Sequence, residues 1–159
     1  MALAGKGKLA EAEADLAALN KMIPGWPADL IAGLNDAKQL LSLAAKILEA
    51  RIATLEKNKD ALTLWAEAVA LEDKTAYSEP ADWFYPTRHF QGAALLAAKQ
   101  AKLAEAVYRE DLRRNPNNGW GLFGLMQSQA MEKKKDPTVA AAFKQAWAKA
   151  DTELKASAF

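Results

Sequence analysis

The side chains best suited to chemistry lie in one short stretch of the sequence. It combines carboxylates, aromatic rings, an arginine and a histidine, in the order Tyr77, Glu79, Asp82, Trp83, Tyr85, Arg88 and His89. Carboxylates and rings at this density could bind a metal cation, a small ligand or a basic peptide. The same carboxylates could instead cap helices and pair with arginine, which is a common structural use of such residues.

A single histidine limits both metal binding and catalysis. His89 has no acidic residue four positions away on either side, and the sequence has no second histidine and no cysteine. No G-x-S-x-G element, phosphate-binding loop or metal motif is present, and no serine neighbours His89 in sequence. We therefore predict that the chain is not an enzyme and uses no cofactor and no metal. His89 is expected to have a packing role or to hydrogen-bond the preceding loop.

The overall composition is typical of a soluble helical protein. Apolar residues make up 51% and charged residues 26% of the chain, and alanine, the strongest helix former, is abundant. A net charge of +1 gives no attraction for nucleic acid or an anionic membrane. No apolar run reaches the roughly 18–20 residues that span a bilayer. We predict a cytoplasmic location by default, while a secreted or periplasmic one stays open because a leader or upstream region could have been removed.

The helical spacing of apolar residues predicts a series of helices joined by polar or proline-containing turns. These helices are expected over residues 8–22, 36–56, 61–73, 87–99, 102–114, 119–131 and 137–155, with a weaker helical turn over 28–34. Asn35 is a suitable N-cap for the longest helix. Residues 74–86 are expected to be irregular but ordered, because their aromatic side chains are too dense for a free linker. The charged run from Arg109 to Arg114 is predicted to form a solvated, salt-bridged helix face.

A repeated pattern is clearest around the stretch from residue 97 to residue 125. Its small residue Ala104 is followed by Tyr108 four positions later and Pro116 twelve positions later. The same spacing recurs twice: one copy has a proline stop, and in the other an aspartate replaces the proline. The two copies are Ala12, Leu16 and Pro24, and then Ala61, Trp65 and Asp73. Gly92 precedes the reference unit, and Trp120, Phe123 and Gly124 open a further one.

This pattern resembles the tetratricopeptide repeat, in which helix pairs recur about every 34 residues. More narrowly, the segments AYSEPADWFYPTRH, GAALL and EAVYREDLRRNPNNGWGLFGL look like the C-terminal part of a longer bacterial protein of that family. One departure is Asp111, which stands where the repeat usually has a small residue. The resemblance implies an all-α fold of antiparallel helix pairs stacked as an α–α superhelix, a solenoid forming a single domain over 1–159. Its degenerate units would cover about 8–24, 36–73, 86–116 and 117–155, with the irregular loop at 74–86.

Stacked helix pairs leave a concave face lined by the first helix of each pair. Projection of the helices places on this face Lys46, Ala50, Ala53, His89, Ala93, Leu96, Gly121, Leu125 and Ser128. These side chains are mostly small and apolar, which suits an extended peptide or a partner helix. The C-terminal helix or a neighbouring protomer could fill the groove instead.

The leading prediction is therefore a protein–protein interaction scaffold that binds a protein or peptide, of a kind that the sequence does not specify. No nucleic-acid or membrane partner is expected. One alternative is a self-associating fragment of a larger repeat protein, forming a homodimer through an N-terminal edge whose apolar stripe includes Leu16. Another is a small-ligand or metal site in the 77–89 stretch.

Overall fold

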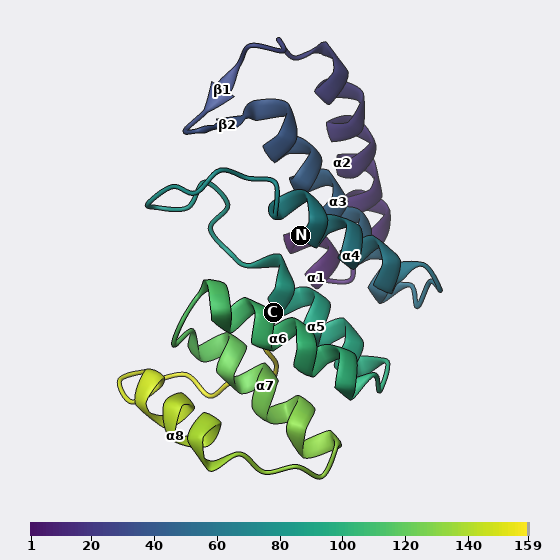
Figure 1. Ribbon diagram of the computed structural model, residues 1–159. Coiled ribbons are helices and arrows are strands. Elements are labelled where there is room, and N and C mark those ends of the chain that lie inside the picture. Colours follow the sequence, from purple (N-terminus) through teal and green to yellow (C-terminus); the bar gives the residue numbers. More distant parts are fainter. Residues whose placement is uncertain (159) are drawn as a thin grey trace. The chain divides into compact units, whose positions relative to one another are not determined.

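The computed structural model describes residues 1–158 of the chain (Figure 1). Its helices are α1 (Ala2–Gly5), α2 (Leu9–Met22), α3 (Ala37–Leu55), α4 (Ala61–Glu72), α5 (Thr87–Ala97), α6 (Ala101–Arg114), α7 (Gly119–Met131) and α8 (Pro137–Ala146). A short 3-10 helix, η1 (Ile23–Gly25), and two strands, β1 (Ile31–Ala32) and β2 (Asn35–Asp36), lie between α2 and α3. The predicted all-α class is thus confirmed, with adjacent helices packed on one another, whereas stacking as a superhelix stays a prediction.

Two compact units divide the chain. Unit 1 is Met1–Thr87, and unit 2 is Arg88–Phe159, of which the structure describes all but the last residue. Unit 1 contains α1 to α4, and unit 2 contains nearly all of α5 together with α6 to α8. Each unit is considered separately below.

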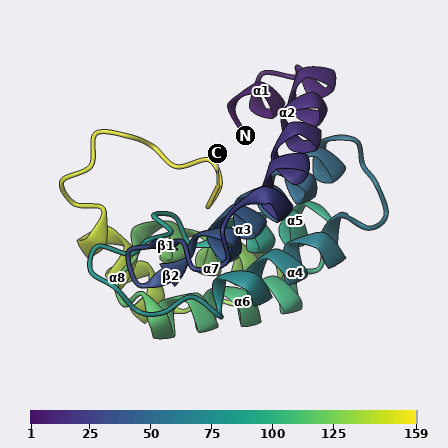
Figure 2. The same ribbon diagram turned by 90° about the horizontal axis from the view of Figure 1, so that it is seen from above.

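Unit 1 is built around α3. This helix packs against α2 on one side and α4 on the other, as Figure 2 also shows. Alanines at positions 45, 50 and 53 are buried along α3, so the neighbouring helices can approach it closely. Trp65 of α4 is 1% exposed, and its indole Nε1 donates a hydrogen bond of 2.8 Å to Thr54 Oγ1. The short α1 closes the N-terminal end, where Ala4 is buried in a cluster with Ala12, Leu48 and Ile52. The α2 stripe that was predicted to form an open edge thus packs within unit 1, with Leu16 half-buried against this cluster.

The helical turn predicted over 28–34 is wrong, because these residues enter a hairpin. Ile31 pairs with Asp36 and Ala32 with Asn35 in an antiparallel ladder. Gly33 makes the turn at a φ of +62°, a conformation that suits glycine. The cap of α3 is also one residue later than predicted: Asp36 Oδ1 accepts hydrogen bonds from the Lys38 and Gln39 amides at 2.6 and 3.2 Å.

Unit 2 is built around the ring of Tyr108 on α6, which is 0% exposed. Gly92 of α5 and Gly124 of α7 both lie directly against this ring. A Cβ atom at Gly92 would lie 2.3 Å from Tyr108 Cζ, and one at Gly124 would lie 2.2 Å from the same atom. The two glycines therefore let α5 and α7 come close to the tyrosine of α6. On the other side of α7, α8 packs through Phe143, whose ring centroid is 5.6 Å from that of Phe123, and Trp147, directly after α8, lies 5.7 Å from Trp120 of α7.

The last helix ends at Ala146, nine residues before the predicted end at 155. Trp147 begins a non-helical segment, and its indole Nε1 donates to the Thr152 carbonyl oxygen at 2.7 Å. Further along, Leu154 is 8% and Ser157 0% exposed. The apolar stripe of α8 predicted a longer helix. The chain instead leaves the helix early, and the burial of Leu154 and Ser157 outweighs the local preference for helix.

Candidate functional site

The most unusual feature of unit 2 is a set of polar side chains in its core. His89 of α5 and Asp111 of α6 are both 0% exposed, and His89 Nε2 lies 2.8 Å from Asp111 Oδ2. Asn115 Nδ2 donates to the other carboxylate oxygen at 3.1 Å. Gly121 of α7 leaves room for the group, since a Cβ there would lie 2.5 Å from Asp111 Oδ2. The aspartate that departs from the repeat pattern is thus accommodated by a histidine partner and a glycine.

Asp111 was predicted to belong to a solvated helix face, and for this residue the prediction is wrong. The remaining charges of the run do pair at the surface. Glu110 accepts hydrogen bonds from Arg113 and Arg114, which lower the pKa of Glu110 to about 2. Arg109 bonds Glu105 one turn earlier. The helical period assigns Asp111 to the opposite side of α6 from these pairs, toward α5 and α7.

The C-terminal segment is held by the same core. Ser157 Oγ donates to the His89 carbonyl oxygen at 3.0 Å and lies 2.6 Å from the Tyr108 hydroxyl. Because the single serine proton goes to the carbonyl, Tyr108 must donate to Ser157. Burial raises the pKa of Tyr108 and so keeps the phenol protonated for this role. Gln127 Nε2 of α7 donates to the Lys155 carbonyl oxygen at 3.3 Å. Residues 155–157 are therefore anchored to α5, α6 and α7.

Ser157, His89 and Asp111 are the residue types of a hydrolase triad, but their arrangement does not support that chemistry. The serine hydroxyl donates to the backbone carbonyl of His89, so its proton is not directed to the imidazole. All three residues are 0% exposed, and a substrate therefore has no access to the hydroxyl. A nucleophile needs both a base and room for the reacting carbonyl. The group is better explained as a polar anchor for residues 155–157.

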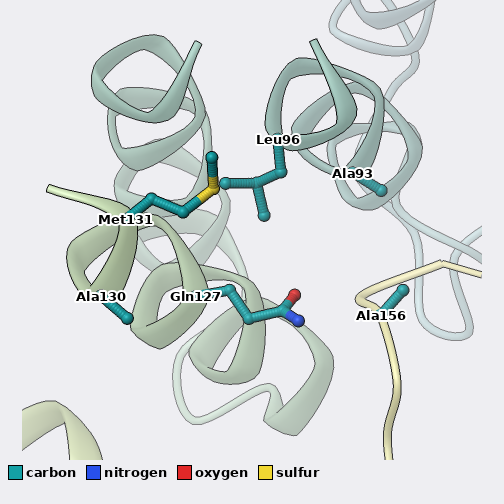
Figure 3. A pocket seen from close by; sticks show the side chains of 6 residues that line it. All are labelled: Ala93, Leu96, Gln127, Ala130, Met131 and Ala156. Carbon is teal, nitrogen blue, oxygen red and sulfur yellow. The ribbon is translucent and has the colours of Figure 1, made fainter. Parts of the chain in front are cut away.

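An open apolar pocket of about 340 Å³ adjoins this anchored segment. We call it the α5–α7 groove, and it is lined by Ala93, Leu96, Gln127, Ala130, Met131 and Ala156. Figure 3 shows Leu96 and Met131 facing one another across it, with the Gln127 amide pointing toward Ala156. Met131 is 47% exposed. The groove thus offers apolar side chains from two helices and one amide that already binds a backbone carbonyl.

The predicted concave-face residues have different positions in the structure. Ala93 and Leu96 line the α5–α7 groove. Four others are buried within unit 2, namely His89, Gly121, Leu125 and Ser128. In unit 1, Ala50 and Ala53 are buried, and Lys46 forms ion pairs with Glu49 and Glu67 at 2.8 and 2.9 Å. These ion pairs favour the charged lysine and raise the pKa of Lys46 against the opposing effect of desolvation by burial.

Sequence reasoning missed Gln127, Ala130, Met131 and Ala156 as groove residues. On α7 the face predicted from the sequence differs from the face that lines the groove. Gln127 lines the groove, whereas its neighbour Ser128 was the predicted residue, and one residue corresponds to about 100° around a helix. Glycine at an interface marks close helix approach, so the buried Gly121 and Gly124 indicate which face of α7 packs against a neighbouring helix. Greater weight on these two glycines would have predicted the orientation of α7 about its axis. Ala156 carried no comparable local signal.

The 77–89 stretch is engaged in structural contacts. Asp82 accepts hydrogen bonds from Asn35 Nδ2 at 2.6 Å and from the Leu34 amide at 3.3 Å, and the Asn35 bond is the main reason why the pKa of Asp82 is lowered. Asn35 Oδ1 accepts from the Ala76 amide at 2.7 Å, so this pair joins the hairpin to the loop.

The other loop residues of this predicted site are distributed as follows. The Tyr77 hydroxyl bonds Glu79, and Tyr77 is 79% exposed. The ring centroids of Trp83 and Tyr85 lie 6.0 and 6.3 Å, respectively, from the ring centroid of Phe84. Arg88 is buried, and His89 belongs to the core of unit 2. Among residues 1–158, no group of three or more histidine, aspartate or glutamate side chains is placed to hold a metal ion.

Comparison with known proteins finds no matching family model, no matching curated protein and no matching solved structure. The resemblance to the tetratricopeptide repeat accordingly stays a prediction based on the sequence motifs. In the described part of the chain, no helix is both long and apolar enough to cross a membrane.

Proposed function

We propose that this protein is an interaction module that binds a non-helical peptide segment of a partner protein in the α5–α7 groove. The observation that carries the proposal is the seating of residues 155–157 at the edge of that groove. Their backbone accepts a hydrogen bond from Gln127, and Ala156 forms one wall of the pocket. A peptide segment is thus already accommodated by the groove's own side chains, which is the arrangement expected of a peptide-binding surface.

The lining favours a ligand with small or aliphatic side chains. Ala93 and Ala130 leave space close to the helix backbones, while Leu96 and Met131 provide apolar contact area. Methionine adapts its shape to different ligands, a property used by other peptide-binding surfaces. Among the residues that the structure describes, no charged side chain lines the groove, so affinity for the partner would come from apolar burial and backbone hydrogen bonds.

A peptide-display selection on the full chain tests this function. Random peptides would be selected for binding and then titrated against the Ala130→Arg variant. Ala130 is an exposed residue that lines the groove, so the arginine should fill the space without disturbing the core. We expect selected peptides to bind Ala130→Arg at least about tenfold more weakly, the effect of losing roughly 1.4 kcal/mol.

The matched control is Ala106→Arg, which introduces the same side chain at an exposed position of α6 away from the groove lining. Peptide affinity for this variant should equal that of the unchanged chain. A selection that yields no specific peptide, or peptides that bind Ala130→Arg as well as the control, would refute the proposal. So would light scattering that shows a dimer lost in Ala130→Arg, because the groove would then belong to a second copy of the chain.

A further inference from the structure

We infer that the C-terminal segment, residues 152–158, is a built-in competitor for the α5–α7 groove, and that its Ala-Ser-Ala sequence shows the kind of peptide the groove accepts. This inference rests on the proposed function and adds a ligand class to it: peptides with a serine between small residues. Ala156 of the segment forms one wall of the groove, and the other lining residues come from α5 and α7.

The burial of Ser157 is the first argument. Residues 151–153 and Lys155 are exposed, yet Ser157 is 0% exposed. Its side chain both donates, to the His89 carbonyl, and accepts, from the Tyr108 hydroxyl. The segment is therefore held through a particular side chain and not only through general apolar contact.

The receiving site is rigid, which is the second argument. Its phenol belongs to the ring packed against Gly92 and Gly124, and its carbonyl belongs to α5. A hydroxyl one carbon from the backbone reaches both groups. Alanine in place of the serine would lack the donor and the acceptor, and a long side chain would not fit an enclosed site. A peptide that replaces the tail should therefore present serine at this position, flanked by small residues such as Ala156 and Ala158.

The third argument concerns competition. A tethered segment has an effective concentration that reaches the millimolar range for short flexible connections. It therefore opposes a free peptide even when its own contacts are weak. A serine side chain and a backbone carbonyl of a free peptide can replace the contacts at Ser157 and at the Lys155 carbonyl, so a better ligand can displace the segment. Release of the tail would lengthen the groove and expose the serine site.

The test uses the full chain with the Ser157→Arg substitution, whose bulk expels the segment from the enclosed site. The probe is a fluorescent peptide with the sequence of residues 150–158, and the matched control variant is Glu153→Arg, at an exposed position of the same segment. We expect the probe to bind Ser157→Arg at least about tenfold more tightly than the unchanged chain or Glu153→Arg, because the tethered competitor is gone. A probe with alanine at the serine position should bind about fivefold to thirtyfold more weakly, the loss expected for one or two hydrogen bonds.

Equal probe affinity for Ser157→Arg and the control, or equal binding of the serine and alanine probes, would overturn the inference. A second measurement needs no substitution. Hydrogen exchange of the amides of residues 152–158 in the unchanged chain should be slow, and a saturating display-selected peptide should accelerate it. If peptides bind while these amides stay protected, the tail is not a competitor and the proposed function survives alone. If no peptide binds at all, the proposed function itself has failed.

Discussion

Replacement of Gly92 by alanine would reverse the usual effect of this change in a helix. Alanine is favoured over glycine in a helix interior by about 1 kcal/mol, so local propensity alone predicts a gain in stability. At this position the new Cβ would lie 2.3 Å from Tyr108 Cζ and 2.6 Å from its Cε1 and hydroxyl oxygen. Ordinary contacts begin at about 3.4 Å, so a gap of about 1 Å must open.

The ring has little freedom to open that gap. Tyr108 is 0% exposed, and its Cζ would also lie 2.2 Å from a Cβ at Gly124. Over-packing typically costs 1–3 kcal/mol, and a confined ring places Gly92→Ala near the upper end at about 3 kcal/mol. After the propensity gain, the free energy of unfolding should fall by about 2 kcal/mol. For a chain of this length that lowers the Tm by roughly 4–8 °C.

A double-mutant cycle isolates the cause. In a Tyr108→Leu background the atoms that collide with the new Cβ are absent, so Gly92→Ala should raise stability by up to about 1 kcal/mol. The expected coupling free energy between the two positions is therefore about 3 kcal/mol, measured by urea unfolding followed by circular dichroism. Gly25→Ala is the control, since no atom of residues 1–158 lies within 4 Å of its new Cβ. If Gly92→Ala has the same effect in both backgrounds, the packing explanation is wrong.

Two further predictions concern the polar core of unit 2. The raised pKa of Tyr108 means that its contribution to stability is fully present below the unfolded-state pKa of about 10 and is lost as pH rises above that value toward the higher folded pKa. Urea midpoints between pH 8 and 11 should therefore decline more steeply for the unchanged chain than for Tyr108→Phe, and parallel declines would contradict this. Asp111→Ala removes the partner of His89 Nε2 and should lower the free energy of unfolding by about 3 kcal/mol. Asp111→Asn keeps a hydrogen-bonding side chain and should lower the free energy of unfolding clearly less than Asp111→Ala does. Equal losses of stability for the two variants in thermal or urea unfolding would contradict a specific pairing with His89.

Much of the helical architecture could be predicted because its determinants are local. Apolar residues three and four apart define each helix face, and turn residues separate the helices. Asp136 shows this at α8, where its carboxylate accepts from the amides of Thr138 and Val139, directly ahead of the proline that begins the helix. The signals that predict these elements lie within one or two turns of the residues they fix.

The errors share one physical origin, which is competition from distant partners. Residues 31–36 form a hairpin in which Asn35 is hydrogen-bonded to Asp82, 47 positions away. The residues around Asn35 in the sequence do not predict that bond. Asp111 has charged neighbours typical of a solvated surface, but its partner His89 lies 22 positions back, on another helix.

The candidate site shows the same division. The sequence by itself determined that α5 and α7 would present small and apolar residues, and it identified Ala93 and Leu96 among them. It also supplied the Gly92, Tyr108 and Gly124 pattern that brings the helices together. Only the tertiary structure decided that the last helix stops early and that Ser157 returns to His89, 68 positions away. A buried hydroxyl must find hydrogen-bonding partners wherever the packed core provides them, and helical periodicity cannot locate such partners.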